Sequence, residues 1–210
     1  MTGLLFDLDG TLLDTLEDLL DATNFALEAH GYPPRTLSEL RGFVGNGAYN
    51  QIRLSVPEGA DPMPVLKTYQ SYYPDHCQIK TRPYEGIAQA LEILGQRYPM
   101  AIVSNKPDAA VKKLCAQLFP GIFALGETAE RPRKPAPDMV YGAMAQLGVD
   151  RCIYIGDSEV DILTAKNAGV PCISVTWGFR DETDLIKNGA ECLCHTPENL
   201  IRILLADQSI

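Results

Sequence analysis

The chain has 210 residues, 46% of them hydrophobic, which is enough for one folded core with a small insert. Its 18 basic and 27 acidic side chains give a net charge of −9, which argues against a general nucleic-acid binder, since such proteins need a basic surface. The charge does not exclude an anionic small substrate, because a site can be locally positive around a metal ion.

The N-terminal segment begins with a short apolar run, Leu4–Phe6, which is typical of a buried strand. Asp7 and Asp9 follow directly and interrupt the apolar residues, so we expect neither a signal peptide nor a membrane-spanning segment. Charge is costly at the end of a buried strand, so these two acids are either surface turn residues or neighbours of a cation.

Residues 14–82 show no strand pattern and are predicted to form a separate helical insert. Thr15 and Asp18 resemble a capping box, and a helix is expected to run from there to His30, with Gly31 as its stop. Further helical stretches are predicted around 37–41, 47–54 and 63–73. The return to the core is expected near residues 81–86, which gives domains of 1–13 with 83–210 and of 14–82.

From residue 83 onward, short apolar runs alternate with helical patterns. We predict strands at 100–103, 122–125, 152–155 and 172–175, and an edge strand at 192–194. Helices are predicted at 87–97, 109–118, 139–147, 161–168 and 197–205. This alternation predicts an α/β fold with a parallel sheet and helices on both of its faces.

Six cysteines are spread through the chain, at positions 77, 115, 152, 172, 192 and 194. Cys192, Cys194 and His195 could suggest a zinc site, but no second pair of ligands accompanies them. Strand alternation is therefore the favoured interpretation of this segment. On balance, the cysteine usage favours a reducing cytoplasm.

Polar residues follow three of the predicted strands at the same edge of the sheet, where ligands of open parallel sheets bind. They are Asp7, Asp9, Gly10 and Thr11; Ser104, Asn105 and Lys106; and Asp157, Ser158 and Asp161. A loop with Lys134 can reach the same edge. Each group alone could be a turn or a helix cap, but together they suit phosphoryl transfer to a carboxylate with Mg²⁺. Asp7 and Asp157 could hold that ion.

The four motifs resemble, in order, those of the haloacid dehalogenase superfamily. They are Asp7-Leu-Asp9-Gly10-Thr11, Ser104-Asn-Lys, Lys134-Pro-Ala-Pro and Gly156-Asp157-Ser-Glu-Val-Asp161. The resemblance implies a Rossmann-like, three-layer α/β/α core with a mobile helical cap.

The same resemblance implies a role for each motif residue. Asp7 would be the nucleophile and Asp9 the general acid and base. Ser104 and Lys134 would contact the phosphate, with the main-chain amides near Leu8 and Asn105. Mg²⁺ would bind Asp7, the Asp9 main-chain carbonyl and Asp157, with Asp161 in or near the outer ligand shell.

A second resemblance, to phosphoglycolate phosphatases and a related pyrophosphatase branch, rests on Arg41-Gly-Phe-Val-Gly45-Asn46-Gly47 and Thr176-Trp177-Gly178-Phe179-Arg180. It implies a small phosphorylated metabolite as substrate, with Asn46 or Arg41 of the insert contacting it. Gly10, Thr11 and Asn105 are further predicted substrate-binding residues. Gly45 and Gly47 could instead only allow a turn into the next helix.

Several alternatives within and outside this superfamily remain open. Dehalogenases lack an acid at the position of Asp9, and the insert lysines, Lys67 and Lys80, come late for a phosphonate-cleaving enzyme. A cytoplasmic, Mg²⁺-dependent phosphatase, monomeric or homodimeric, is the first hypothesis. A sugar-phosphate mutase and a pyrophosphatase are alternatives, and a non-catalytic binding protein is a third class.

Overall fold

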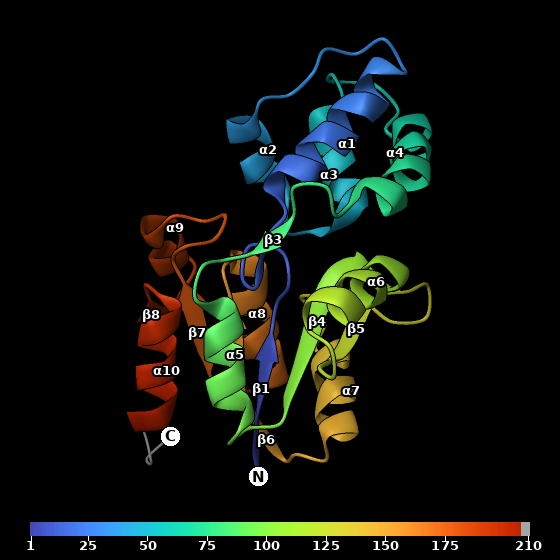
Figure 1. Cartoon of the computed structure of the whole chain (residues 1–210). Helices are drawn as coiled ribbons and strands as arrows, with labels where there is room; N and C mark the ends of the chain where they lie inside the picture. Colours follow the sequence, from blue (N-terminus) through green and yellow to red (C-terminus); the bar gives the residue numbers. More distant parts are fainter. Residues whose placement is uncertain (207–210) are drawn as a thin grey trace. The chain divides into compact units, whose positions relative to one another are not determined.

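A computed structural model describes residues 1–206, and this chain forms two compact units (Figure 1). Met1–Leu13 and the described residues from Pro83 onward make up one unit, which we call the sheet unit. Asp14–Arg82 make up the other, which we call the helical unit.

The sheet unit contains a six-stranded sheet in which every strand pair is parallel. Its strand order is β5-β4-β1-β6-β7-β8. The strands are β1 (Thr2–Phe6), β4 (Met100–Pro107), β5 (Phe123–Glu127), β6 (Arg151–Gly156), β7 (Cys172–Val175) and β8 (Leu193–Cys194). The predicted parallel α/β architecture is confirmed, and β8 forms the expected edge.

Helices cover both faces of this sheet, and Figure 1 shows α5 and α10 in front of it and α8 behind it. The helices are α5 (Ile87–Gly95), α6 (Asp108–Leu118), α7 (Asp138–Leu147), α8 (Glu159–Ala168), α9 (Glu182–Lys187) and α10 (Pro197–Ala206). All but α9 were predicted from the sequence, with ends that differ by a few residues.

The central strand β1 is buried on both faces, since Leu4, Leu5 and Phe6 are each at most 1% exposed. Leu5 belongs to a cluster with Met139 and Val140 of α7, whereas its neighbours in the strand point to the opposite face. A strand held in this way delivers the residues that follow it to a fixed place at the carboxyl edge of the sheet.

The helical unit contains α1 (Leu16–Glu28), α2 (Leu37–Phe43), α3 (Gly47–Ser55) and α4 (Met63–His76). On α1, Leu19, Ala22 and Ala26 recur at helical spacing and are buried, and α1 packs mainly against α4. Two short strands, β2 (Leu13–Asp14) and β3 (Arg82–Pro83), pair at the two chain crossings between the units. The sequence pattern did not predict these strands.

The predicted capping box at Thr15 and Asp18 is wrong. Thr15 precedes α1, but its side chain makes no capping hydrogen bond, and its hydroxyl has no hydrogen-bond partner among the described residues. The carboxylate of Asp18 instead accepts hydrogen bonds from the main-chain N–H groups of Ile79, Lys80 and Thr81, at 2.8–3.0 Å. The Asp18 carboxylate therefore makes hydrogen bonds across the helical unit in place of a cap at the start of α1.

Asp18 connects the segment that enters the helical unit with the segment that leaves it. Its side chain is 2% exposed, so it exchanges water for three main-chain donors, and such charged hydrogen bonds are among the stronger ones. Lys80 adds ion pairs to Glu17 and Asp21 on the exposed side of α1. Because exposed ion pairs contribute little, Asp18 is the main tie between these two segments.

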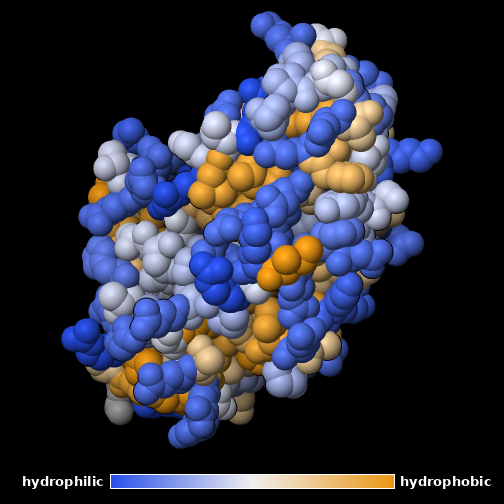
Figure 2. Space-filling view, turned by 45° about the horizontal axis from the view of Figure 1, so that its top comes forward, coloured by the Kyte–Doolittle hydropathy of each residue, from blue (hydrophilic) through white to orange (hydrophobic). Residues whose placement is uncertain are grey.

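The surface is mainly hydrophilic on the face that Figure 2 shows, where polar residues interrupt the apolar ones. No helix within residues 1–206 combines the length and the apolar character that crossing a bilayer requires.

We expect Asp18→Asn to destabilise the protein by about 1–3 kcal/mol, because an amide NH₂ would then face main-chain donors in a buried position. Urea unfolding followed by circular dichroism measures this loss. Glu28→Gln, at an exposed position of the same helix, is the matched control and should change stability by less than about 0.5 kcal/mol. Equal effects of the two substitutions would contradict the role of Asp18.

Candidate active site

Asp7 is the first residue after β1, and its position is fixed by the sheet. Its main-chain N–H donates to the Ile155 carbonyl at 2.8 Å, which continues the pairing with β6. The Leu8 N–H donates back to Asp7 Oδ1 at 2.7 Å, so the orientation of the carboxylate is also fixed. Gly10 then turns the chain with a φ of +84°, a conformation that favours glycine.

The end of β4 contributes the second group of residues. The pairing with β5 shifts register between Val103 and Pro107, and Ser104, Asn105 and Lys106 lie within this irregular segment. The Lys106 N–H donates to Ser104 Oγ at 3.2 Å. All three residues are buried, and they lie at the same carboxyl edge of the sheet as Asp7, because β4 pairs in parallel with β1.

The side-chain amide of Asn105 holds the loop that carries Lys134. Its Nδ2 donates to the Lys134 carbonyl at 3.0 Å, and the Lys134 N–H donates to its Oδ1 at 2.7 Å. This pair of bonds positions a loop between β5 and α7 against the end of β4. Asn105 therefore acts on Lys134 through its side chain, and a contact between its main chain and a ligand stays a prediction.

Lys134 lies at the centre of the site, with a side chain that is 1% exposed. Its Nζ is 2.8 Å from Asp7 Oδ1 and 2.7 Å from Asp161 Oδ1, and it lies 5.7 Å from the centre of the Tyr154 ring. Burial alone lowers the pKa of Lys134, but the carboxylates of Asp161 and Asp7 outweigh it. The pKa is raised well above its ordinary value, so Lys134 is a cation.

Asp157 follows β6 and is held by the loop that comes after β7. Thr11 Oγ1 donates to Asp157 Oδ1 at 2.9 Å, and the Phe179 N–H donates to Oδ2 at 2.7 Å. A Cβ on Gly178 would overlap the Asp157 side chain and the Gly10 carbonyl oxygen, so only glycine fits there. The Trp177 indole N–H donates to the Thr11 carbonyl at 3.0 Å and fixes this loop.

Asp161 is fully buried at the start of α8, and both of its oxygens have partners. Oδ2 accepts hydrogen bonds from the Ser158 N–H at 3.1 Å and hydroxyl at 2.6 Å, which forms a capping box. Oδ1 accepts bonds from Lys134 at 2.7 Å and the Tyr154 hydroxyl at 3.3 Å. These contacts fix Asp161 as a support for Lys134.

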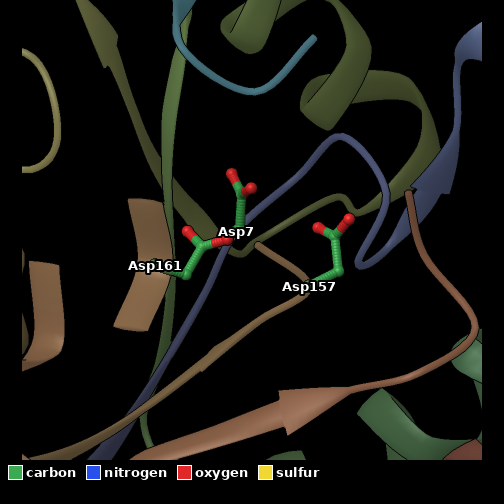
Figure 3. A group of neighbouring side chains, drawn as sticks. All are labelled: Asp7, Asp157 and Asp161. Atoms are coloured by element: carbon green, nitrogen blue, oxygen red, sulfur yellow. The ribbon is translucent and has the colours of Figure 1, made fainter. Parts of the chain in front are cut away.

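Asp7, Asp157 and Asp161 form a buried group of carboxylates in which one oxygen of each lies within 4.8 Å of the others (Figure 3). The Asp7 and Asp157 carboxylates point the same way in Figure 3. Burial, followed by the charge of Asp161, raises the pKa of Asp157 to about 7. The same two causes raise the pKa of Asp7 well above its ordinary value, although Lys134 acts against them.

The charges of this group do not balance within it. Three buried carboxylates face the single ammonium of Lys134, so full ionisation leaves two negative charges in excess. One divalent cation would neutralise that excess, and oxygen is the ligand atom that hard divalent cations prefer. The donor set therefore fits a divalent metal ion.

Asp9 lies outside this carboxylate group and is more accessible, with a side chain that is 16% exposed. Lys106 Nζ is 3.0 Å from Asp9 Oδ1, so the two side chains form an ion pair. The geometry of this contact is not that of a hydrogen bond. Two carboxylates that are one residue apart in sequence thus have different cationic partners, Lys134 for Asp7 and Lys106 for Asp9. Such separation allows the two acids to have different tasks.

The structure brings most of the sequence-predicted site residues together at this edge. These are Asp7, Asp9, Gly10, Thr11, Ser104, Asn105, Lys134, Asp157 and Asp161. The Thr11 hydroxyl is used to hold Asp157. Arg41 and Asn46 belong to the helical unit, at the end of α2 and just before α3, and their contact with a substrate stays a prediction.

Two contacts that hold Asp157 were not predicted from the sequence. They are the hydrogen bond from the Phe179 N–H and the close packing of Gly178 against the Asp157 side chain. The only signal was the segment Thr176–Arg180, a Trp-Gly pair after a strand. That pattern indicates a tight loop, but it does not say which residue the loop approaches.

A family model described as "Haloacid dehalogenase-like hydrolase" matches residues 4–175 of this chain. A phosphoglycolate phosphatase of Rhodobacter capsulatus is 37% identical over 190 residues, which cover 85% of each chain. An N-acetylmuramic acid 6-phosphate phosphatase of Pseudomonas aeruginosa is 30% identical, with 97% of this chain and 95% of the relative covered.

A crystal structure of a candidate phosphoglycolate phosphatase from Lactobacillus delbrueckii subsp. bulgaricus has the same fold, with a TM-score of 0.92. The two chains are 40% identical, and the match covers 98% of each.

We expect Gly178→Ala to destabilise the protein by about 1–3 kcal/mol, because the added methyl group must displace Asp157 or the Gly10 carbonyl. The bond from the Phe179 N–H should weaken with it, so hydrogen exchange at this amide should become faster. Urea unfolding and residue-resolved exchange measure the two effects.

Gly142→Ala is the matched control, since a Cβ there makes only ordinary contact with Leu125 at 3.6 Å in a regular helix. It should be neutral or stabilise by about 0.5–1 kcal/mol. Unchanged exchange at Phe179 in Gly178→Ala would show that the loop does not hold Asp157 as described.

Proposed function

The chain belongs to the haloacid dehalogenase-like hydrolases and is a phosphatase, and from this premise we propose that it hydrolyses a small phosphomonoester of the 2-phosphoglycolate type with Mg²⁺. The observation that carries the proposal is the buried carboxylate group around Asp7, balanced in part by Lys134. Relatives named phosphoglycolate phosphatase support the substrate class.

Mg²⁺ is the cation proposed for the excess negative charge of this site. Asp7, Asp157 and the Asp9 main-chain carbonyl would hold it, whereas the oxygens of Asp161 already accept bonds from Ser158, Lys134 and Tyr154. When bound, Mg²⁺ supplies positive charge that stabilises the phosphate oxygens during transfer. Asp161 would then act on the site through Lys134.

Asp7 is the proposed nucleophile. Its carboxylate oxygen would attack phosphorus, so that a new bond forms to Asp7 and the bond from phosphorus to the ester oxygen breaks. Leu8 and Lys134 fix the other carboxylate oxygen, which preorganises the attack. Lys134 also places a positive charge where the phosphate oxygens would lie.

Asp9 is the proposed general acid and base. It would give a proton to the departing ester oxygen and later take one from the water that attacks phosphorus, which releases phosphate and restores Asp7. Its position outside the buried carboxylate group and its greater exposure support this exchange of protons. The Ser104 hydroxyl and the main-chain amides near Leu8 and Asn105 would bind the phosphate oxygens.

The helical unit is the proposed cap. Its entry and exit strands, β2 and β3, are adjacent, and Asp18 ties the neighbouring segments together, which supports movement of the unit as one body. Arg41 and Asn46 are its proposed substrate contacts. Such a cap would exclude bulk water and choose the alcohol part of the substrate.

A larger sugar 6-phosphate is the second candidate substrate, because the 30% identical relative from P. aeruginosa is named for such a compound. Both candidates are phosphomonoesters, so the same sheet-unit chemistry applies. We also propose a cytoplasmic location, which the six free cysteines support.

Asp7→Asn should lower phosphate release from 2-phosphoglycolate by at least about 10³-fold, since an amide is a poor nucleophile. Stability should be kept or increased, because one of three buried negative charges is removed. Phosphate assays and thermal unfolding measure both. Glu92→Gln, at an exposed position of α5, is the control and should retain full activity. Normal turnover by Asp7→Asn would refute the nucleophile.

Saturating Mg²⁺ should raise the melting temperature of the wild-type protein by about 5 °C or more, as expected for a ligand far above its Kd. Asp157→Asn should lose most of this increase, and EDTA should stop hydrolysis by the wild type. Differential scanning fluorimetry gives the temperatures without any substrate. An equal increase in both proteins would place the cation elsewhere.

A further inference from the structure

Two lysines are buried among the residues that the structure describes, Lys134 and Lys106. Lys134 is paired with two carboxylates, Asp7 and Asp161, on the side of the site where the phosphoryl group would lie. Lys106 has a side chain that is 3% exposed, and its ammonium is 3.0 Å from Asp9. The family resemblance implied no role for Lys106.

The contact with Asp9 places the Lys106 ammonium near the proposed position of the leaving group. Asp9 is the proposed proton donor to the ester oxygen of the leaving group, so a cation in contact with Asp9 lies close to the atoms bonded to that oxygen. The main chain of Lys106 is also held, because its N–H donates to Ser104 Oγ within the irregular end of β4.

The carboxylates of the site repel an anionic leaving group unless a cation lies on the side where that group binds. Asp7, Asp157 and Asp161 form a group of three carboxylates, and Asp9 follows Asp7 by two residues in a chain whose net charge is −9. A buried ammonium is costly and is retained only where it has charged partners. An ammonium beside Asp9 would offset this repulsion for a leaving group that is itself anionic.

We propose that Lys106 is a specificity-determining residue that binds the carboxylate of an alcohol leaving group, so that the preferred substrates carry an anion on the carbon next to the ester carbon. This inference rests on the proposed function and deepens it. In 2-phosphoglycolate a single CH₂ group separates the ester oxygen from the carboxylate, so that carboxylate can reach a cation adjacent to Asp9.

The test compares two esters of equal length, 2-phosphoglycolate and 2-hydroxyethyl phosphate, in which a neutral CH₂OH replaces the carboxylate. The wild type should prefer 2-phosphoglycolate in kcat/KM. Lys106→Met should raise the KM for 2-phosphoglycolate about 10- to 100-fold, as expected for the loss of a charged hydrogen bond, with a smaller change in kcat. Its kcat/KM for 2-hydroxyethyl phosphate should fall much less, so that the ratio of the two kcat/KM values falls about 10-fold or more.

Two further variants separate charge from structure. Lys106→Arg keeps a cation and should retain most of the preference for 2-phosphoglycolate. Lys166→Met, which removes an exposed lysine of α8, should leave the kinetics of both esters unchanged. If Lys106→Met lowers kcat/KM equally for both esters, or if the wild type shows no preference, the proposal is overturned while the phosphatase assignment stands.

Failure of the proposed function has a different signature. Wild-type protein that hydrolyses neither ester in Mg²⁺ would contradict that function, and calorimetric binding of 2-phosphoglycolate would then decide the role of Lys106. Binding that weakens at least about 10-fold in Lys106→Met supports the proposal. Binding of equal strength in both proteins, or none in the wild type, overturns it.

Discussion

The burial of three carboxylates around one lysine is the constraint on which the rest of the site depends. Burial disfavours the ionised form of these acids and neighbouring like charges add to that effect, so the pKa values of Asp7 and Asp157 are raised. Lys134 offsets one charge, and a divalent cation would offset the remaining two. This arrangement is unfavourable for folding, but the same charges serve the proposed transfer of a phosphoryl group.

The fold tolerates this cost because each acid is held by groups that leave it little freedom. Asp7 extends a strand that is buried on both faces, and Asp161 caps the helix that it begins. Asp157 depends on two distant parts of the chain, Thr11 and Phe179. The precision of the site therefore comes from the carboxyl edge of the sheet and from one loop packed against it.

The parallel sheet and the residues at its carboxyl edge could be predicted from the sequence. Buried parallel strands give continuous apolar runs, and ligands bind where those strands end. Local patterns were less reliable. Ser158 and Asp161 form a capping box, but Thr15 and Asp18, with the same spacing, do not. Asp18 reaches amides about 60 residues later, and no local pattern contains that information. The pairing of Lys106 with Asp9 was hidden for the same reason.

The central claim is that Asp7 itself becomes bonded to phosphorus. It is tested most directly by mixing the protein with 2-phosphoglycolate and Mg²⁺, quenching in acid within the first turnover, and weighing the peptide that contains Asp7. The account predicts that this peptide gains the mass of one phosphoryl group. Release of phosphate without any such gain would contradict it.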